Sequence, residues 1–477
     1  MKQASLTRNT TYYTAALTVQ KILAFIYFWF ISNQLFPEDL GKYVFALSFT
    51  TLFSIFIDLG LSPVLTREAA KDKQRANDFL RNVIGLKLPL AVMTIIAATL
   101  VITFSGKPAD VLLLVYLAII IMTLDSFSLS FWVTFRAHLN LFYESLGVIA
   151  VQIIIFTLGI TALLTTGAVA YLMLALLAAS TFNFILALLL LKLKLKFTLA
   201  PKIDAEVVKY FLKIIPAFAL AGIFVKIYNT ADSVLLSFLT GDAAVGFFAV
   251  PAKVVYAFQQ VIPAAFAAVI FPAFSYYHAS AREKLASTFE KAFSYLTIIS
   301  LPLAAGLVLL APEIINLVWK SYTPVIPTFV VMALAIPFIF LAFPTGHLLN
   351  ATDQQRRTTL NRGIIVVLAV GLNIALIPRF SFFGTGVTFL ITNVLLLFMD
   401  LYWVRTVVPF NEKALIKIVG KSLVATLVMT ALILTTKAQL NLILVIILSM
   451  ATYFVTLYVV RGITVGEIKE LITKGSR

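Results

Sequence analysis

Four lysines, Lys21, Lys87, Lys226 and Lys253, interrupt long apolar stretches of the sequence. A charged side chain at the centre of a membrane-spanning helix costs roughly 2.5 to 3.5 kcal/mol on insertion scales, so it generally faces a partner or a water-filled cavity. A lysine ammonium is a compact point charge that suits phosphate. If their segments cross a membrane, each of these four residues needs a partner, a hydrated cavity or a route for its ammonium back to the membrane surface.

The neighbours of three of these lysines favour a cavity. Residues three, four, seven and eleven apart share one face of a helix. At this spacing lie Asn229, Thr230, Ser233 and Ser237 for Lys226, Tyr256 and Gln260 for Lys253, and Thr14 and Thr18 for Lys21. A polar stripe is poorly placed against lipid. We therefore expect Lys21, Lys226 and Lys253 to line one cationic cavity that binds the substrate.

Two acidic residues accompany this predicted cavity. Asp232 lies about 240° around the helix from Lys226, so we expect it to meet a different helix. Asp125 lies about two turns inside its segment and has no simple explanation as a loop anchor. Together with Asn229, Thr230 and Gln260, these two are candidate cavity or ion-coupling residues.

Structural roles are the alternative explanation for the remaining intramembrane charges. Lys87 lies about two turns inside its segment, so its stem could carry the ammonium back to the cytoplasmic surface, which is the role we expect. Carbonyls or hydroxyls could also satisfy Lys21 in a purely structural role. Asp58, Glu144 and Asp400 lie toward the cytoplasmic ends of their segments, where we interpret them as packing or loop-anchoring charges.

The elements that must position these residues are membrane-spanning helices. Of the 477 residues, 61% are hydrophobic and 12% charged, against roughly 45 to 50% and 25% in soluble domains. Because about 20 apolar residues cross a bilayer core, the sequence predicts an all-α polytopic membrane protein with about 14 spans. They are 12–36, 41–62, 79–104, 111–134, 141–165, 168–191, 209–238, 244–273, 290–311, 325–349, 360–378, 383–407, 415–435 and 439–460.

Basic residues alternate between the loops that these spans define. Twenty-eight Lys and Arg residues fall on one side, including Lys2, Lys469, Lys474 and Arg477 near the two ends, whereas only Lys42, Lys107, Lys320, Arg379 and Lys437 fall on the other. Cytoplasmic loops are the basic ones, so both termini are expected in the cytoplasm, with the protein in the cell (inner) membrane. The net charge of +16 thus indicates topology, and we expect no nucleic-acid partner.

The two halves of the chain contain similar segments. KILAFIYFWFISNQLFPEDLGKYVF at 21–45 aligns without a gap to KIYNTADSVLLSFLTGDAAVGFFAV at 226–250, which pairs Lys21 with Lys226 and Gly41 with Gly246. Internal repeats are typical of secondary transporters, whose substrate site lies near the midplane at the repeat interface. We predict an N-terminal lobe at 1–200, a C-terminal lobe at 201–409, and two further helices with a cytoplasmic tail at 410–477.

Other functional classes lack their usual residues. The phosphate-binding pattern G-x-x-x-x-G-K-[ST] does not occur, there is no cysteine, and the three histidines are scattered. The sequence therefore predicts neither an enzyme nor a metal site.

Four motifs carry a resemblance to a known family. PEDLGKYVFALSF at 37–49, DLGLSPVLTREAA at 58–70, TADSVLLSFLTGDAAVGFFAVPAKV at 230–254 and AFAAVIFPAFS at 265–275 resemble the polysaccharide-biosynthesis flippases of the multidrug/oligosaccharidyl-lipid/polysaccharide exporter superfamily. The resemblance implies fourteen helices in two lobes around a central cavity. It also implies that an oligosaccharide on a polyprenyl pyrophosphate is moved to the outer leaflet by alternating access.

The resemblance also implies binding partners, and it leaves two alternative functions open. A lipid-linked oligosaccharide and membrane lipids would be bound, a polysaccharide polymerase and glycosyltransferases would act in the same process, and no cofactor is expected apart from coupling to an H⁺ or Na⁺ gradient. One alternative is an ion-coupled multidrug exporter, although a cationic drug would favour carboxylates over three lysines. Another is a peptidoglycan-precursor flippase, whose relatives tend toward arginine in the cavity.

Overall fold

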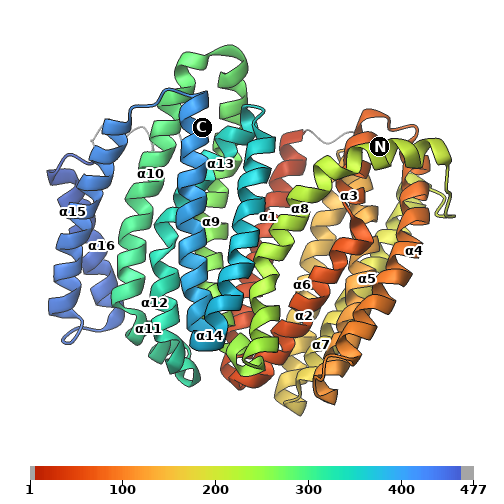
Figure 1. The fold of residues 1–477 in the computed structure, drawn as a ribbon, viewed down its shortest axis with the longest axis horizontal. Helices are drawn as coiled ribbons and strands as arrows, with labels where there is room; N and C mark the ends of the chain where they lie inside the picture. The colour runs from red at the N-terminus through yellow and green to blue at the C-terminus, as the bar shows by residue number, and fades with distance from the viewer. Residues whose placement is uncertain (1–5, 464–477) are drawn as a thin grey trace. The chain divides into compact units, whose positions relative to one another are not determined.

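A computed structural model of the chain describes residues 6–463, apart from the side chains of residues 6–8, 10, 217 and 218. Helices and short connections make up this part, and it contains no strand. The α-helices, labelled in Figure 1, are α1 (Leu6–Gln34), α2 (Pro37–Asp58), α3 (Leu61–Lys71), α4 (Ala76–Thr103), α5 (Ala109–Ala137), α6 (Phe142–Thr166), α7 (Val169–Leu190), α8 (Ala205–Leu239), α9 (Asp242–Ser280), α10 (Arg282–Leu309), α11 (Ala311–Val318), α12 (Ile326–Leu334), α13 (Ile336–Ala351), α14 (Gln355–Val407), α15 (Glu412–Thr436) and α16 (Leu442–Val459). A π-helical turn, Leu191–Leu195, and a 3₁₀ segment, Lys320–Val325, complete the set.

Thirteen helical segments of the described chain are long and apolar enough to cross a membrane. One of them, Gln355–Val407, has 53 residues, or about 80 Å of helix against a hydrocarbon core of roughly 30 Å. It is bent at Ser381, whose φ of 50° and ψ of −136° are not helical, so it supplies two passes. The all-α expectation is confirmed, and thirteen candidate segments, one of them long enough for two passes, agree with the expected number of about 14 spans. The predicted tail and the charges of Lys2, Lys469, Lys474 and Arg477 lie outside the described residues.

The chain forms two compact units, Met1–Gly246 and Phe247–Arg477. The first unit includes α8, because this helix packs against α2, α3 and α4. The compact boundary therefore falls later than the lobe boundary at residue 200 that the internal repeat predicts. Which segments move together as lobes stays a prediction. In the second unit, α15 packs against α10 and α16 (Figure 1).

Each unit has its own apolar core. In the first, Leu65, Leu80, Phe135, Leu191 and Phe211 bring together side chains from α3, α4, α5, the end of α7 and α8. In the second, Ile298, Met429, Ile433 and Tyr453 pack between α10, α15 and α16, and the Tyr453 hydroxyl donates to the Ile298 carbonyl at 2.8 Å. Satisfying that buried hydroxyl avoids the cost of an unpaired polar group.

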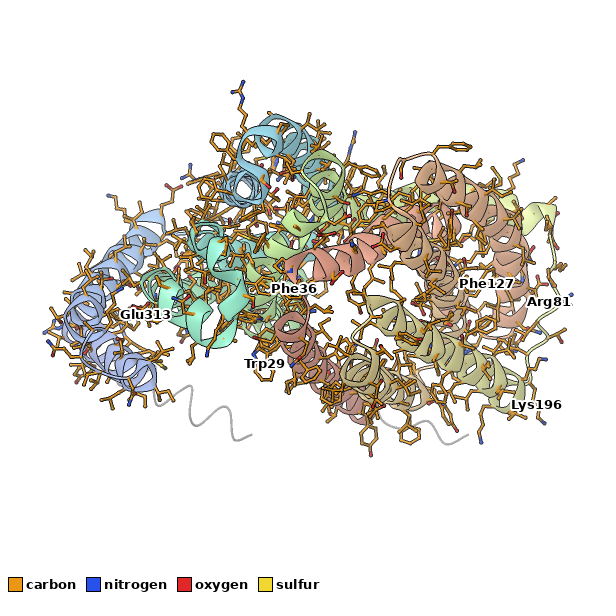
Figure 2. The ribbon with its side chains drawn as sticks, turned by 90° about the horizontal axis from the view of Figure 1, so that it is seen from below. Trp29, Phe36, Arg81, Phe127, Lys196 and Glu313 are labelled. Atoms are coloured by element: carbon orange, nitrogen blue, oxygen red, sulfur yellow. The ribbon has the colours of Figure 1, made fainter. Side chains whose placement is uncertain are left out.

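The segment that leads into α8 is tied to α4. Arg81 Nε donates to the Ala200 carbonyl at 2.9 Å, and a Cβ on Gly85 would lie 2.4 Å from the Lys202 carbonyl oxygen, so only glycine allows this approach. Lys202 pairs with Asp78 and Asp204 at 3.0 and 3.1 Å. The hydrogen bond to Asp78 raises the pKa of the Lys202 ammonium, and Lys202 lowers the pKa of Asp204. Figure 2 shows Arg81 and Lys196 at this edge of the first unit.

Candidate functional site

A buried ion pair lies within the first unit. The Lys87 side chain is 0% exposed, and its Nζ lies 2.6 Å from Asp58 Oδ1. The ammonium also donates to the Ser62 hydroxyl at 3.2 Å and to the Ser126 carbonyl at 2.9 Å. The prediction that Lys87 carries its charge back to the membrane surface is wrong. It was based only on distance from the helix end, whereas a carboxylate at the same depth satisfies the ammonium inside the bundle.

The backbone places Asp58 where it can meet Lys87. Asp58 is the last residue of α2, and the chain turns there through Leu59 and Gly60, whose φ angles of 41° and 85° lie in the left-handed region. Because α3 begins immediately afterwards, Ser62 folds back and donates its hydroxyl hydrogen bond to Asp58 Oδ1. The DLG turn thus holds the carboxylate toward α4, where Lys87 lies.

Lys226 lies beside this ion pair. Its half-buried side chain comes from α8, and Nζ donates to the Ser54 hydroxyl of α2 at 2.9 Å. Electrostatic attraction also connects Lys226 to Asp58. Two ammonium groups therefore surround one carboxylate. Counting Asp58, Lys87 and Lys226, the cluster carries one net positive charge, which suits it to an anion.

The other residues of α8 that were predicted to line the cavity differ in their exposure. Asp232 and Ser233 are buried, whereas Asn229 is exposed. The Thr230 hydroxyl donates to the Lys226 carbonyl at 2.7 Å within the helix. Part of the predicted polar stripe is therefore buried or hydrogen-bonded inside the first unit.

The remaining candidates lie on three other helices. Lys21 is an exposed residue of α1, and Asp125 of α5 lies near Ser180 of α7. Lys253 is half-buried on α9 in the second unit, with the exposed Gln260 two turns further along. Convergence of Lys21, Lys226 and Lys253 on one ligand stays a prediction.

A second feature is the close crossing of α2 with the first turn of α9. A Cβ on Gly41 would lie 1.7 Å from the Asp242 carbonyl oxygen, and a Cβ on Gly246 would lie 1.8 Å from the Pro37 carbonyl oxygen. The separation of 205 residues that relates Lys21 to Lys226 also relates Pro37 to Asp242 and Gly41 to Gly246. The two contacts are thus equivalent under the internal repeat, which supports the alignment inferred from sequence.

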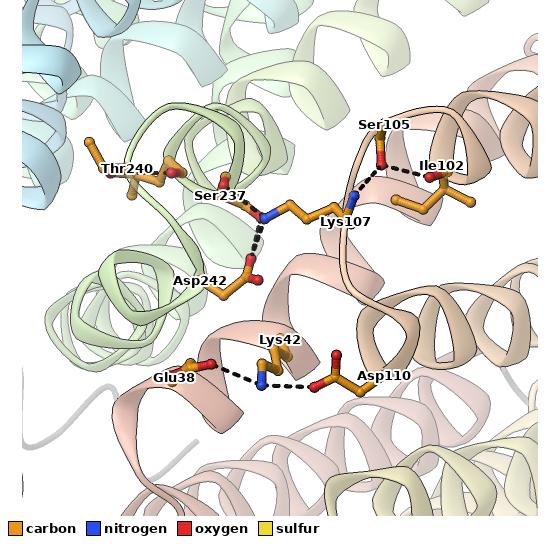
Figure 3. Close-up of polar contacts among 10 residues, drawn as sticks. Glu38, Lys42, Ile102, Ser105, Lys107, Asp110, Ser237, Thr240 and Asp242 are labelled. Atoms are coloured by element: carbon orange, nitrogen blue, oxygen red, sulfur yellow. Dashed lines mark hydrogen bonds and ion pairs between the residues drawn. The ribbon is translucent and has the colours of Figure 1, made fainter.

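Ion pairs surround this crossing, as Figure 3 shows. Lys107, in the turn between α4 and α5, donates to the Ser237 carbonyl and to Asp242 Oδ1, both at 2.8 Å. Lys42 bridges Glu38 and Asp110 at 2.9 and 2.8 Å. We call Lys42, Lys107, Asp110 and Asp242 the turn clasp. The turn clasp connects α2 with the α4–α5 and α8–α9 turns. The sequence predicted Lys42 and Lys107 only as loop charges that indicate topology, so these ion pairs were not expected.

A further ionic contact anchors α1. Arg136 of α5 binds Glu144 of α6 through Nε at 2.8 Å, and Tyr13 of α1 donates to Glu144 at 3.3 Å. Glu144 is buried, so its expected role as an anchoring charge fits these contacts. Among the described residues, no group of three or more His, Asp and Glu side chains could hold a metal ion.

The missed residues Asp58 and Ser54 could have been found by one sequence signal. Asp58 lies about one turn before the end of the second predicted span, 41–62, and Lys87 lies about two turns inside the third, so alternation of direction puts both near the same membrane face. Opposite charges at equal depth in adjacent spans are candidates for pairing. Ser54, one helical turn before Asp58, then lies on the same face of α2.

Comparison with solved structures shows which known fold the chain has. The fold is similar to that of a lipid II flippase MurJ in an inward closed conformation, with a TM-score of 0.78 and 14% identity over 93% of this chain and 97% of that one. It is also similar to an inward-facing MATE family multidrug resistance transporter of the MOP superfamily, with a TM-score of 0.68 and 16% identity over 81% and 94%. A MOP superfamily transporter from Pyrococcus furiosus gives a TM-score of 0.56 and 14% identity over 84% and 94%. The chain thus has the multi-pass fold of these transporters.

The sequence itself identifies the family. A family model described as polysaccharide biosynthesis protein matches residues 6–278, more than half of the chain. The chain belongs to this family, as its four motifs led us to expect. No curated protein sequence matches it.

Proposed function

We propose that this protein moves a polyprenyl-pyrophosphate-linked oligosaccharide from the cytoplasmic to the outer leaflet by alternating access, for cell-surface polysaccharide biosynthesis. The observation that carries the proposal is the net positive cluster around Lys226, inside a helical unit of this family. A pyrophosphate entering a low-dielectric site needs cations that are already in place. Lys21 and Lys253 would complete the site, and a polymerase and glycosyltransferases would act on the same glycan.

Charge distinguishes this proposal from drug export. A cationic drug would be repelled by a cluster with one excess ammonium, and two like charges at close range disfavour each other by about 1 kcal/mol even in water. The fold is shared by MurJ and MATE proteins, so the fold alone favours neither. The cluster therefore favours an anionic substrate, with peptidoglycan precursors as the nearest alternative.

The direction of transport depends on orientation, which a fusion experiment determines. We propose that both termini are cytoplasmic, because the basic residues concentrate on the loops of that side. Reporter fusions at Gly106, Gly241 and Lys437 should then report the outside, and a fusion at Lys202 the inside. An inside signal from Gly241 would reverse the proposed direction.

Neutralising the lysines tests their role in binding. Lys→Gln changes at Lys21, Lys226 or Lys253 should each lower translocation about ten- to a hundredfold, since a charge-assisted bond to phosphate contributes roughly 1.5 to 3 kcal/mol. Lys→Arg changes keep the charge and should retain more activity. Translocation is measured in proteoliposomes containing matched amounts of protein. Full activity of all three Gln variants would show that the lysines are structural.

A further inference from the structure

The Lys226 ammonium already binds an acceptor within the protein, on α2. The Ser54 hydroxyl donates its one hydrogen to the Thr51 carbonyl at 2.6 Å, which leaves its oxygen free to accept from Lys226 Nζ at 2.9 Å. Asp58 lies one helical turn further along α2 and attracts the same ammonium. The Ser54 hydroxyl oxygen thus binds the Lys226 ammonium directly, as a phosphate oxygen would, and the Asp58 carboxylate adds electrostatic attraction.

The two lysines of the cluster differ in their freedom to respond. Lys87 is 0% exposed and is enclosed by Asp58, Ser62 and Ser126. Lys226 is half-buried, and the one hydrogen bond from its ammonium that the structure assigns ends on Ser54. Lys87 therefore fixes the position of the Asp58 carboxylate, while Lys226 is the ammonium that can be transferred to a ligand.

We propose that Ser54 and Asp58 are positioning residues that hold Lys226 against α2 and compete with the anionic head of the substrate for its ammonium. This inference rests on the proposed function, since it assumes that Lys226 binds the anion. Competition weakens binding but allows release, because departure of the anion returns Lys226 to an oxygen ligand instead of leaving it desolvated. The oxygen atoms of Ser54 and Asp58 on α2 thus make the strong ionic contact between Lys226 and the anion reversible.

The test uses Ser54→Ala, which removes the acceptor without leaving a buried charge unpaired. Farnesyl pyrophosphate is the anionic probe and farnesol the uncharged one, with binding measured on the purified full chain in detergent. Ser54→Ala should tighten farnesyl pyrophosphate binding about three- to tenfold, in line with one lost intramolecular hydrogen bond. It should lower the maximal rate of translocation while lowering the half-saturating substrate concentration. Farnesol binding should not change.

Two further variants separate the possible outcomes. Ser128→Ala is the matched control, because the Ser128 hydroxyl of α5 donates to its own helix at the Leu124 carbonyl and does not contact Lys226. In a Lys226→Gln background, Ser54→Ala should have no further effect. If Lys226→Gln leaves farnesyl pyrophosphate binding unchanged, the proposed function of Lys226 fails. If Lys226→Gln weakens binding but Ser54→Ala does not tighten it, the competition inference alone is overturned.

Discussion

Replacing Lys87 by methionine should destabilise the protein by about 3 to 5 kcal/mol, because removing one partner of a buried ion pair leaves the other charge uncompensated. Here the group that loses its direct partner would be Asp58, whose side chain is only 15% exposed and which would keep only the weaker attraction of Lys226. Asp58→Asn alone should destabilise for the converse reason, since Lys87 would then lack its counter-charge. We expect both single variants to show lower yields of monodisperse protein after detergent extraction and lower melting temperatures.

The double variant Asp58→Asn/Lys87→Met should recover most of this loss. It removes both charges together, and replacing a complete buried pair by neutral groups is often tolerated. Lys192→Met is the control for the loss of a lysine, because Lys192 is exposed. Recovery in the double variant would identify an energetic coupling between the two residues. Single variants as stable as the wild type would contradict the ion-pair interpretation.

Gly41→Ala should disrupt the crossing of α2 and α9 and reduce translocation strongly. The added Cβ would lie 1.7 Å from the Asp242 carbonyl oxygen, a backbone atom that cannot move by a side-chain rotation. Overpacking of this kind costs about 1 to 3 kcal/mol. The conformation in which the turn clasp is formed, including its contact between Lys107 and Asp242, should therefore become less populated. Under the proposed topology this is the outer end, and we expect alternating access to require that it close.

Thiol accessibility can measure this opening. The chain has no cysteine, so Ala244→Cys introduces a single thiol at a buried position in the first turn of α9. Gly41→Ala should raise its labelling rate by a membrane-impermeant maleimide. Gly222→Ala on α8 is the matched control, because a Cβ there meets no atom within 4 Å. Equal labelling in the Gly41→Ala and Gly222→Ala backgrounds would mean that the crossing does not control access.

Local features of the sequence explain the predictions that succeeded. Hydropathy gives the fourteen passes because each must hide its backbone from lipid over a fixed thickness. The equivalence of Gly41 and Gly246 could be inferred because an internal repeat preserves spacing. The structure adds that the two glycines face the start of the other repeat's helix, which no alignment states.

The interactions that the sequence did not predict depend on tertiary contacts. Depth alone makes Asp58 a candidate partner of Lys87, but the pairing itself depends on the Leu59–Gly60 turn, which directs Asp58 toward α4. The packing of α8 against α2, α3 and α4 likewise depends on side chains far apart in sequence, such as Tyr210, which donates to Glu68 at 3.0 Å. Ser54 could be placed on the same face of α2 as Asp58, but its contact with Lys226 follows only from the hydrogen bond in the structure.

The most direct measurement of the central claim compares a charged and an uncharged lipid in the same proteoliposomes. One probe is a polyprenyl pyrophosphate carrying a fluorescent disaccharide, and the other carries the same disaccharide without the pyrophosphate. Bleaching of the outward-facing fluorophore by dithionite reports movement between leaflets. The account predicts that the protein accelerates movement of the pyrophosphate-linked probe, that it does not accelerate the uncharged one, and that Lys226→Gln removes most of this difference. Equal acceleration of both probes, with no dependence on Lys226, would contradict it.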